Sequence, residues 1–502
     1  MLRNIGSNWV LIVVSIAATY YLTPFTIKTL GQDGYGTWTL ITALTGHITL
    51  LSLGVPAACV RYLSEHVAAN DSRRISETIG SCAGLYLAIG VAAAAAGAVL
   101  MFVFQSYQIP SAFKSEAPLA FILMVVTVAT SFMGFLPEGI LFAHQDFVRR
   151  NIVRLVVGIA VRATLTFTLL AVNASLVVLA GIQLVCLMLD FGASYLLIRR
   201  RYPAVRISFS GFNLRKVKKI VSFGFYVLVF NAGARLSFET AALVIGALLT
   251  VSTIPYYVVA NSLMVYLMEF VIAIEAVVSP MTTKLNAEGR AEDIGEMFLT
   301  WSKVAVSLTI MSGLFLIVLG PRFLSWWIDP SYEEPSGQVL QILMLSGFAF
   351  LPIRGVAVPI LIGLGRPRLP ALAFLIAGLA NVALGALLAR PFGLVGIALG
   401  TAIPNAIFAL VVLVVACRAV HVPLGRWAAY VLPRAMIGAV PALGVLLWFR
   451  VSLQVRSLPG LIAAAGAMAV VFAFTWVWFV YRDDPYVNLR AQLPTVRAWV
   501  RA

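Results

Sequence analysis

Long apolar runs recur along the whole chain, and they constrain its fold more than any other feature of the sequence. A run of about 20 apolar residues is long enough to cross a hydrocarbon core about 30 Å thick as a helix. The 502-residue chain is 61% hydrophobic and only 11% charged, whereas a soluble protein needs about 25% charged residues to cover its surface. The sequence therefore predicts an all-α polytopic membrane protein, with no room between the runs for a soluble domain of ordinary size.

The runs predict about 14 transmembrane helices. Two pairs of spans are separated by very few residues, around Asn173 and around Pro391, and these divisions rest on the shortest breaks in hydropathy. The expected spans are approximately residues 4–30, 35–62, 76–106, 115–143, 151–172, 174–198, 220–249, 253–283, 295–319, 337–364, 370–389, 391–418, 427–449 and 458–481.

Lys and Arg are distributed unevenly between the connecting loops. An even number of spans places both termini on one side, and that side collects about 25 Lys and Arg against about six on the other. A net charge of +16 would suggest a nucleic-acid partner in a soluble protein. Here it reflects the positive charge of cytoplasmic loops, so we expect both termini in the cytoplasm and no nucleic-acid partner.

A polar segment from Arg199 to Ile220 follows the sixth expected span and predicts a linker on the anionic inner leaflet. In the tail after Arg482, apolar residues such as Leu489 and Trp499 alternate with arginines, which suits either a short interfacial helix or a disordered tail. The predicted organisation is an N-terminal six-helix lobe (1–200), a cytoplasmic linker (201–219), a C-terminal six-helix lobe (220–420), two additional transmembrane helices (421–482) and a cytoplasmic tail (483–502).

Several expected spans contain proline, which removes a backbone donor and bends a helix. Membrane helices tolerate proline where neighbouring groups satisfy the freed carbonyls. Proline is also simply commoner in membrane helices than in soluble ones. Because prolines occur in both halves of the chain, we expect bundles that bend, with Pro24, Pro280 and Pro352 as candidate hinges.

Ionisable side chains inside apolar spans are costly and usually face the protein interior or water. Asn231, Arg235 and Glu239 are spaced i, i+4, i+8 and share one helical stripe. Arg354 lies between two prolines, and Glu269 lies in the eighth span. These groups indicate either a hydrated cavity for an anionic headgroup, with Glu239, Glu269 and Asn231 available for ion coupling, or buried ion pairs such as Arg235 with Glu239.

Two further arginines lie in spans of the N-terminal half. Arg162 is at mid-span and Arg61 is near the inner end of the second span. Both are candidates for the same cationic cavity. The alternative is that either guanidinium reaches lipid phosphates at the interface.

Motifs for catalysis or metal binding are absent from the sequence. It has no P-loop, no HExxH and no nucleophile elbow, and its four histidines lack the spacing of metal ligands. The four cysteines form no CxxC and lie in or beside apolar runs. We therefore expect a protein that is not an enzyme, with no catalytic residue, no metal and no cofactor. A membrane glycosyl-polymerase is also disfavoured, because the outer loops are short.

Several short sequence motifs are spread over residues 4 to 420. The first two spans carry an early Asn, Pro24, the pattern LG-x3-YG from Leu30 to Gly36, and later Gly54 and Arg61. IGALLTVSTIPYYVVA, LIGLGRPR and PFGLVGIALGTA follow in the second half, the last after Asn381. This pattern resembles the polysaccharide biosynthesis, or oligosaccharide flippase, family, whose superfamily includes the MATE drug exporters and the lipid II flippase.

The resemblance implies two six-helix lobes in a V shape, related by a pseudo-two-fold, plus two C-terminal helices. It also implies alternating access between the lobes while a prenyl tail stays in lipid. Many members carry Asp on the seventh span where this chain has Glu239. Glu239 keeps the negative charge of that Asp on a longer side chain.

Together, the residues and the resemblance predict a flippase of the bacterial inner membrane. It would move an undecaprenyl-pyrophosphate-linked oligosaccharide to the outer leaflet for O-antigen, capsule or exopolysaccharide synthesis. Its expected partners are that lipid-linked substrate, membrane lipids, a polysaccharide polymerase and a chain-length regulator. Buried arginines suit a pyrophosphate, because their planar fork matches phosphate oxygens. The alternative is a cation-coupled exporter of drugs or metabolites, which would need an acidic or aromatic cavity. The interior charges do not decide between the two functions, because four arginines are balanced by four carboxylates: Arg61, Arg162, Arg235 and Arg354 against Glu138, Glu239, Glu269 and Glu275.

Overall fold

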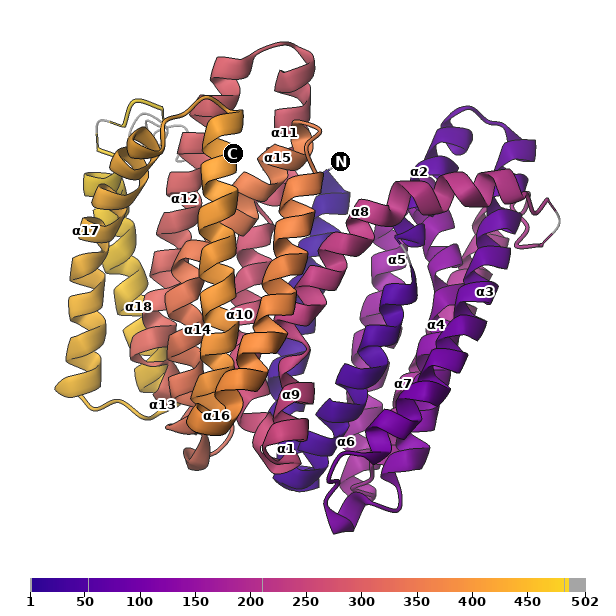
Figure 1. Cartoon of the computed structure of the whole chain (residues 1–502), viewed down its shortest axis with the longest axis horizontal. Helices are drawn as coiled ribbons and strands as arrows, with labels where there is room; N and C mark the ends of the chain where they lie inside the picture. Colours follow the sequence, from indigo (N-terminus) through magenta and orange to yellow (C-terminus); the bar gives the residue numbers. More distant parts are fainter. Residues whose placement is uncertain (1, 53, 210, 483, 487–502) are drawn as a thin grey trace. The chain divides into compact units, whose positions relative to one another are not determined.

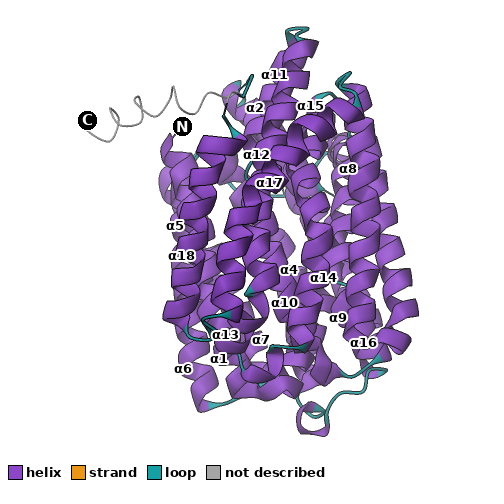
Figure 2. Cartoon of the chain, turned by 90° about the vertical axis from the view of Figure 1, so that its left-hand side faces the viewer, coloured by secondary structure: helices purple, strands orange, loops and turns teal. Residues whose placement is uncertain are grey.

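The computed structural model describes residues 2–52, 54–209, 211–482 and 484–486. In these residues the chain forms helices and loops and contains no strand (Figure 2). Figure 1 colours the helices along the chain. The predicted all-α membrane protein is confirmed. The expectation for the tail beyond Arg482, including Leu489 and Trp499, lies almost wholly outside the described residues.

The chain divides into two compact units. The first comprises Met1–Arg235 and Ala242–Pro255, and the second comprises Leu236–Ala241 and Tyr256–Ala502. The predicted boundaries between lobes, linker and additional helices stay a prediction.

The helices up to residue 248 mostly belong to the first unit. They are α1 (Leu2–Ile48), α2 (Val55–Ala68), α3 (Ser72–Gln105), α4 (Ala117–Ala143), α5 (Phe147–Val153), α6 (Arg162–Val172), α7 (Leu176–Arg201), α8 (Leu214–Phe238) and α9 (Ala241–Leu248). A π-helix, Arg154–Val161, joins α5 to α6. Helix α4 packs against both α3 and α7, and Phe104 of α3 stacks on Phe121 of α4 with ring centroids 4.8 Å apart.

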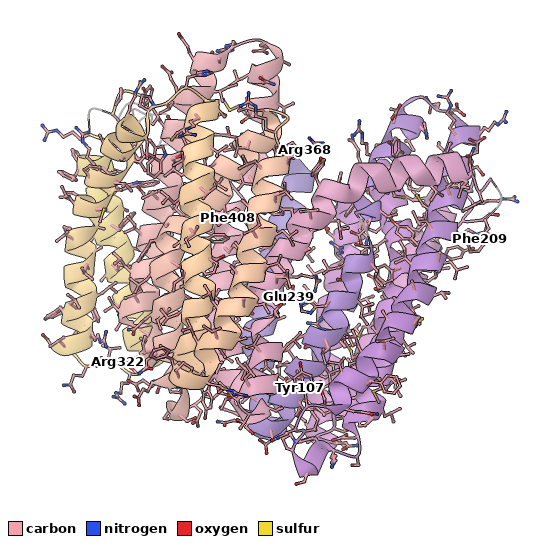
Figure 3. The ribbon with its side chains drawn as sticks, viewed as in Figure 1. Tyr107, Phe209, Glu239, Arg322, Arg368 and Phe408 are labelled. Atoms are coloured by element: carbon pink, nitrogen blue, oxygen red, sulfur yellow. The ribbon has the colours of Figure 1, made fainter. Side chains whose placement is uncertain are left out.

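The remaining helices belong to the second unit. They are α10 (Ile254–Ile272), α11 (Glu275–Ala287), α12 (Ala291–Val318), α13 (Gly320–Trp327), α14 (Pro335–Pro352), α15 (Val358–Gly363), α16 (Arg368–Ala419), α17 (Leu424–Val451) and α18 (Leu458–Thr475). Two π-helices, Ile353–Ala357 and Trp476–Val480, follow α14 and α18. The core contains a cluster of aromatic rings. The ring centroid of Phe408 (Figure 3) lies 4.9 Å from that of Phe374 and 5.7 Å from that of Phe350.

Among the described residues, eleven helices, or twelve with the bent pair α8–α9, are long and apolar enough to cross a membrane. Two of them each merge two helices across a kink, α1 at Gly31 and α16 at Gly393. Division at these kinks brings the number of spans to the expected 14. The two closely spaced pairs are also confirmed, because the backbone is extended at Asn173 and turns at Gly393.

The glycines of the LG-x3-YG motif have separate structural roles. Gly31 has φ +71°, in the left-handed region that glycine adopts without a steric cost, and it breaks α1 there. At Gly36 a Cβ would meet the carbonyl oxygen of Val251 at 2.2 Å, so only glycine permits this approach. A hydrogen bond from Ser252 to Asp33 joins the same two segments. The motif therefore fastens the loop before α10 onto the second half of α1.

The candidate hinge prolines differ in their surroundings. Pro24 and Pro280 lie inside α1 and α11, and neither helix is interrupted at its proline. Pro352 ends α14 and is followed directly by a π-helix. A hinge role for the three stays a prediction.

Helices α17 and α18 pack as a hairpin against α12. Val318 and Leu319 share a buried cluster with Ala442, Leu446 and other apolar residues of the hairpin. At the end of α17, Arg322 (Figure 3) donates to the backbone oxygens of Arg450 and Val455, at 2.8 and 3.3 Å. A cation at this position satisfies carbonyls that have no partner within the helix. The additional helices are thus part of the packed core of the second unit.

Candidate functional site

Arg354 forms an ion pair with Glu275 inside the second unit. Its Nη1 lies 2.8 Å from Oε2 of Glu275, and the two side chains are 13% and 30% exposed. Glu275 is the first residue of α11, just after the short turn that separates α11 from α10, and Arg354 lies in the π-helix after Pro352. Gly355, the residue after Arg354, allows the close approach of α10, because a Cβ at this position would lie 2.9 Å from the Val271 side chain. The predicted intramembrane cation is therefore held beside a carboxylate 79 residues away in sequence.

Asn231, Arg235 and Glu239 follow one another along α8 and into the break after it. Asn231 and Glu239 are exposed, and Arg235 is half-buried. Glu239 (Figure 3) lies between α8 and α9, whose axes bend by 43°. Broken helices of this kind commonly surround substrate and ion sites in transporters, because their ends present polar backbone groups.

Side-chain amides stabilise the end of α8. The carbonyls of Ser237 and Phe238 lack helical partners because the helix stops there. Asn381 donates to the Ser237 oxygen at 3.0 Å, and Asn261 donates to the Phe238 oxygen at 3.1 Å. Asn381 also donates to the Thr401 hydroxyl at 2.9 Å, and that hydroxyl lies 2.9 Å from the hydroxyl of Tyr257. This buried network holds the backbone beside Glu239 in its bent form.

Glu269, the remaining candidate for ion coupling, lies on α10 and is exposed. Within the described residues, it forms no hydrogen bond and no ion pair with a basic side chain.

Arg162 is an intramembrane arginine of the first unit, at the junction of two helical segments. It begins α6 directly after the π-helix and lies near the middle of the span Phe147–Val172. Its side chain is half-buried, yet within the described residues it forms no ion pair and no hydrogen bond through its guanidinium. A buried cation without a counter-charge is costly, and an anionic ligand would offset that cost.

Arg61 lies on α2 and is exposed. Its guanidinium carbon lies 6.0 Å from the ring centroid of the adjacent Tyr62, at the outer limit of a cation–π contact. Of the four predicted arginines, Arg61 is thus the exposed one, whereas the other three are half-buried.

A charged network in the first unit joins α4, α5 and α7. Arg150, whose side chain is 5% exposed, pairs with Asp190 at 2.7 Å and with Glu138 at 3.2 Å. Arg154 also pairs with Glu138, at 2.8 Å. Glu138 was among the interior carboxylates expected from the sequence, whereas Asp190 was not, although an acid inside the apolar run 176–201 is itself a signal. Because its charges are mutually satisfied, we interpret this network as structural.

A second charged group that the sequence analysis missed is Lys303 of α12, which pairs with Asp484. The two side chains are 1% and 0% exposed. Tyr430 donates its hydroxyl to Asp484 at 2.9 Å, and the rings of Tyr430 and Tyr481 lie 4.6 and 4.8 Å from the Lys303 ammonium. Burial alone would raise the pKa of Asp484, but hydrogen bonds from Lys303, the backbone of Tyr486 and Tyr430 hold that pKa below its usual value.

Comparison with known proteins places these features in a family. The model of the family described as "Polysaccharide biosynthesis protein" matches residues 1–286. A relative from Bacillus subtilis (strain 168), named "Uncharacterized membrane protein EpsK", is 23% identical over 433 residues, covering 81% of each chain.

Two solved structures share the fold at low sequence identity. An inward-facing multidrug resistance MATE family transporter of the MOP superfamily superposes with a TM-score of 0.69 at 16% identity, covering 82% of this chain and 98% of its own. The lipid II flippase MurJ, in an inward closed conformation, superposes with a TM-score of 0.68 at 13% identity, covering 95% of this chain and 98% of its own. The chain therefore has the fold shared by these two transporters.

Proposed function

Because the chain belongs to the polysaccharide biosynthesis protein family, we propose that it is a flippase for a polyprenyl-linked oligosaccharide. The substrate is an oligosaccharide joined through pyrophosphate to undecaprenol. The protein moves it from the inner to the outer leaflet of the bacterial inner membrane, with both termini in the cytoplasm. The exported glycan serves O-antigen, capsule or exopolysaccharide synthesis, and a polymerase and a chain-length regulator act after it.

Arg162 is the observation that carries this proposal. Its mid-span position and its lack of a carboxylate partner leave a positive charge available in the first unit. A guanidinium binds phosphate oxygens bidentately, and such charge-assisted hydrogen bonds are about twice as strong as neutral ones. A pyrophosphate headgroup supplies the missing counter-charge, which a cationic drug does not.

The remaining predicted residues act in support of that site. Arg354, Arg235 and Arg61 provide further positive charge for the headgroup. Glu239, Glu269 and Asn231 are candidates for coupling to an ion, and exchange of a proton or cation at Glu239 alters the charge at the bend between α8 and α9. Pro24, Pro280 and Pro352 allow their spans to bend during alternating access. Transport of this kind needs two stable arrangements of packed helices and no catalytic residue.

The fold is compatible with this function, because the lipid II flippase has the same fold. The MATE transporter also shares it, so the fold alone leaves a cation-coupled exporter of small molecules as the alternative. The two functions differ in the charge that they require: the flippase needs the unpaired arginine, and an exporter of cationic drugs does not.

The test compares two arginines of the first unit that differ in their partners. Arg162→Ala strands no carboxylate, so we expect normal protein abundance and a loss of glycan export of about tenfold or more, from the loss of hydrogen bonds worth about 1.5–3 kcal/mol. Arg162→Lys should rescue export in part, because a point charge lacks the planar fork. Arg150→Ala is the matched control: it strands Asp190, while Glu138 keeps Arg154 as a partner, and it should lower abundance.

Export is measured as surface glycan per molecule of membrane-inserted protein in a host deleted for the native gene. Normal export by Arg162→Ala at normal abundance would contradict the proposal. If the deletion instead left the glycan unchanged and sensitised the host to cationic drugs, the exporter would be the correct function.

A further inference from the structure

A cavity of about 340 Å³ lies in the first unit between α2, α3 and the start of α8. Each of the three helices contributes a basic side chain to its lining, namely His66, Arg74 and Lys216. Tyr62 and Glu65 also line it. The cavity is distinct from the mid-span arginines, because its residues lie at the α2–α3 loop and at the end of the linker.

The linker residues that complete the cavity are fastened to α3. The backbone N–H of Asn213 donates to the Ser81 hydroxyl at 3.0 Å, and the Lys216 ammonium lies 2.9 Å from Glu77. Phe212 lies so close to Gly84 that a Cβ there would meet its ring at 2.7 Å. The wall that carries Lys216 is therefore built by specific contacts and is part of the fold.

The basic side chains retain hydrogen-bond donors. Arg74 contacts Asp71 through Nε at 3.3 Å, and neither of its terminal nitrogens has a partner within the described residues. Lys216 has three donors and uses two of them, on Glu77 and on the backbone oxygen of Arg74. His66 forms no hydrogen bond through its ring with any described residue. Burial and the positive charge of Lys216 lower its pKa, and Arg74 adds to the effect.

The side chains next to the cavity are suited to a membrane surface. Phe209, at the outer edge of the first unit (Figure 3), is 54% exposed, and Phe212 is 53% exposed. Exposed aromatic rings beside basic residues favour the headgroup region of a bilayer. The expected cytoplasmic location of the linker places the cavity at the anionic inner leaflet.

We propose that this cavity binds the phosphate group of a lipid headgroup. Phosphate oxygens accept charge-assisted hydrogen bonds from Arg74 and Lys216, and from His66 when it is protonated. Glu65 opposes an anion in the same cavity and limits the affinity. Two lipids carry this chemistry at the inner leaflet, an anionic phospholipid and a prenyl pyrophosphate, and either would reach the cavity from the membrane surface.

The experiment measures binding to the purified full-length protein in detergent, so its outcome is independent of transport. The probes are short-chain phosphatidylglycerol, farnesyl pyrophosphate, short-chain phosphatidylcholine and inorganic phosphate. We expect saturable binding of the first two, competition between them, and weaker binding of the zwitterionic and inorganic probes. The tighter of the first two probes identifies the class of lipid.

Variants then test the site itself. Lys216→Gln and Arg74→Gln should each weaken binding about tenfold, and Glu65→Gln should tighten it severalfold. Lys284→Gln is the matched control, because Lys284 is an exposed lysine of α11 that pairs with a glutamate one turn away; its binding should be unchanged. Gly84→Val keeps every charge but displaces Phe212, so it should weaken binding as well.

Thermal unfolding of each variant shows whether it is folded. Equal binding by wild type and by folded Lys216→Gln and Arg74→Gln variants would overturn the proposal. Inorganic phosphate that binds as tightly as both lipids would also overturn it, because the site would then select no lipid.

Discussion

Removal of either member of the buried pair Lys303–Asp484 should weaken the packing of α17 and α18 against the rest of the second unit. Lys303→Met removes the ammonium partner of the Asp484 carboxylate, which is 0% exposed and which also accepts from the Tyr430 hydroxyl and the backbone N–H of Tyr486. Loss of one partner of a buried pair typically costs about 3–5 kcal/mol. Lys303→Met also removes the cation–π contacts of the ammonium with the rings of Tyr430 and Tyr481, both within 5 Å, which adds about 1 kcal/mol.

The double variant separates the pair's contribution from general damage. Lys303→Met with Asp484→Leu leaves no stranded charge, so we expect its free energy of unfolding to lie within about 1 kcal/mol of wild type. The coupling energy of the double-mutant cycle should then be about 3 kcal/mol or more, well above the value for an exposed pair. A more exposed pair, Arg456 with Glu333 at 3.4 Å, is the control and should show a coupling below about 1 kcal/mol.

The assay is unfolding of the purified protein in detergent, followed by urea or by temperature, with proteolysis of the C-terminal segment as a second probe. The single variants should become sensitive to protease between α18 and the tail, while the double variant should resist. Single variants that unfold like wild type, or a coupling energy near zero, would refute the interpretation of this pair as the structural attachment of α17 and α18.

Three further predictions follow from the fold and the site. Cysteines placed at Ser210 and Ser331 should react with an impermeant reagent from opposite sides of the membrane, against a low background because all four native cysteines are buried; labelling of both from outside would contradict the topology. Asn381→Leu should lower stability by about 1–3 kcal/mol, because the Ser237 carbonyl loses its donor, and unchanged unfolding would contradict a role for the amide at the bend. Arg354→Ala should strand Glu275 and reduce abundance, whereas Arg354→Ala with Glu275→Ala should restore it; abundance that stays low in the double variant would contradict the stranded charge as the cause.

Hydropathy alone predicted most of the fold, because lipid imposes a long apolar run on every spanning helix. The two short breaks, at Asn173 and near Pro391, were found in the same way and are present as an extended residue and a kink at Gly393. The bend between α8 and α9 was not predicted. It falls within a continuous apolar run, and its stabilising donors, Asn261 and Asn381, come from other helices.

The partners of the intramembrane charges could not be read from the sequence. Helical spacing suggested pairs within one helix, such as Arg235 with Glu239. That pair stays a prediction. Two other intramembrane pairs join segments far apart in the chain, 40 residues for Arg150 with Asp190 and 79 residues for Arg354 with Glu275. Such contacts depend on how helices pack, and spacing along one helix carries no information on this. Lys303 was missed for a related reason, because its partner Asp484 lies beyond the last span.

The most direct test of the account is flipping by the purified protein in liposomes that contain a fluorescent prenyl-pyrophosphate-linked saccharide. A membrane-impermeant reagent that modifies the sugar reports the fraction in the outer leaflet over time. We predict that wild-type protein moves the substrate across the bilayer, that Arg162→Ala slows this about tenfold or more, and that Arg162→Lys has an intermediate rate. Flipping by Arg162→Ala at the wild-type rate, or no difference between wild-type and protein-free liposomes, would contradict the account.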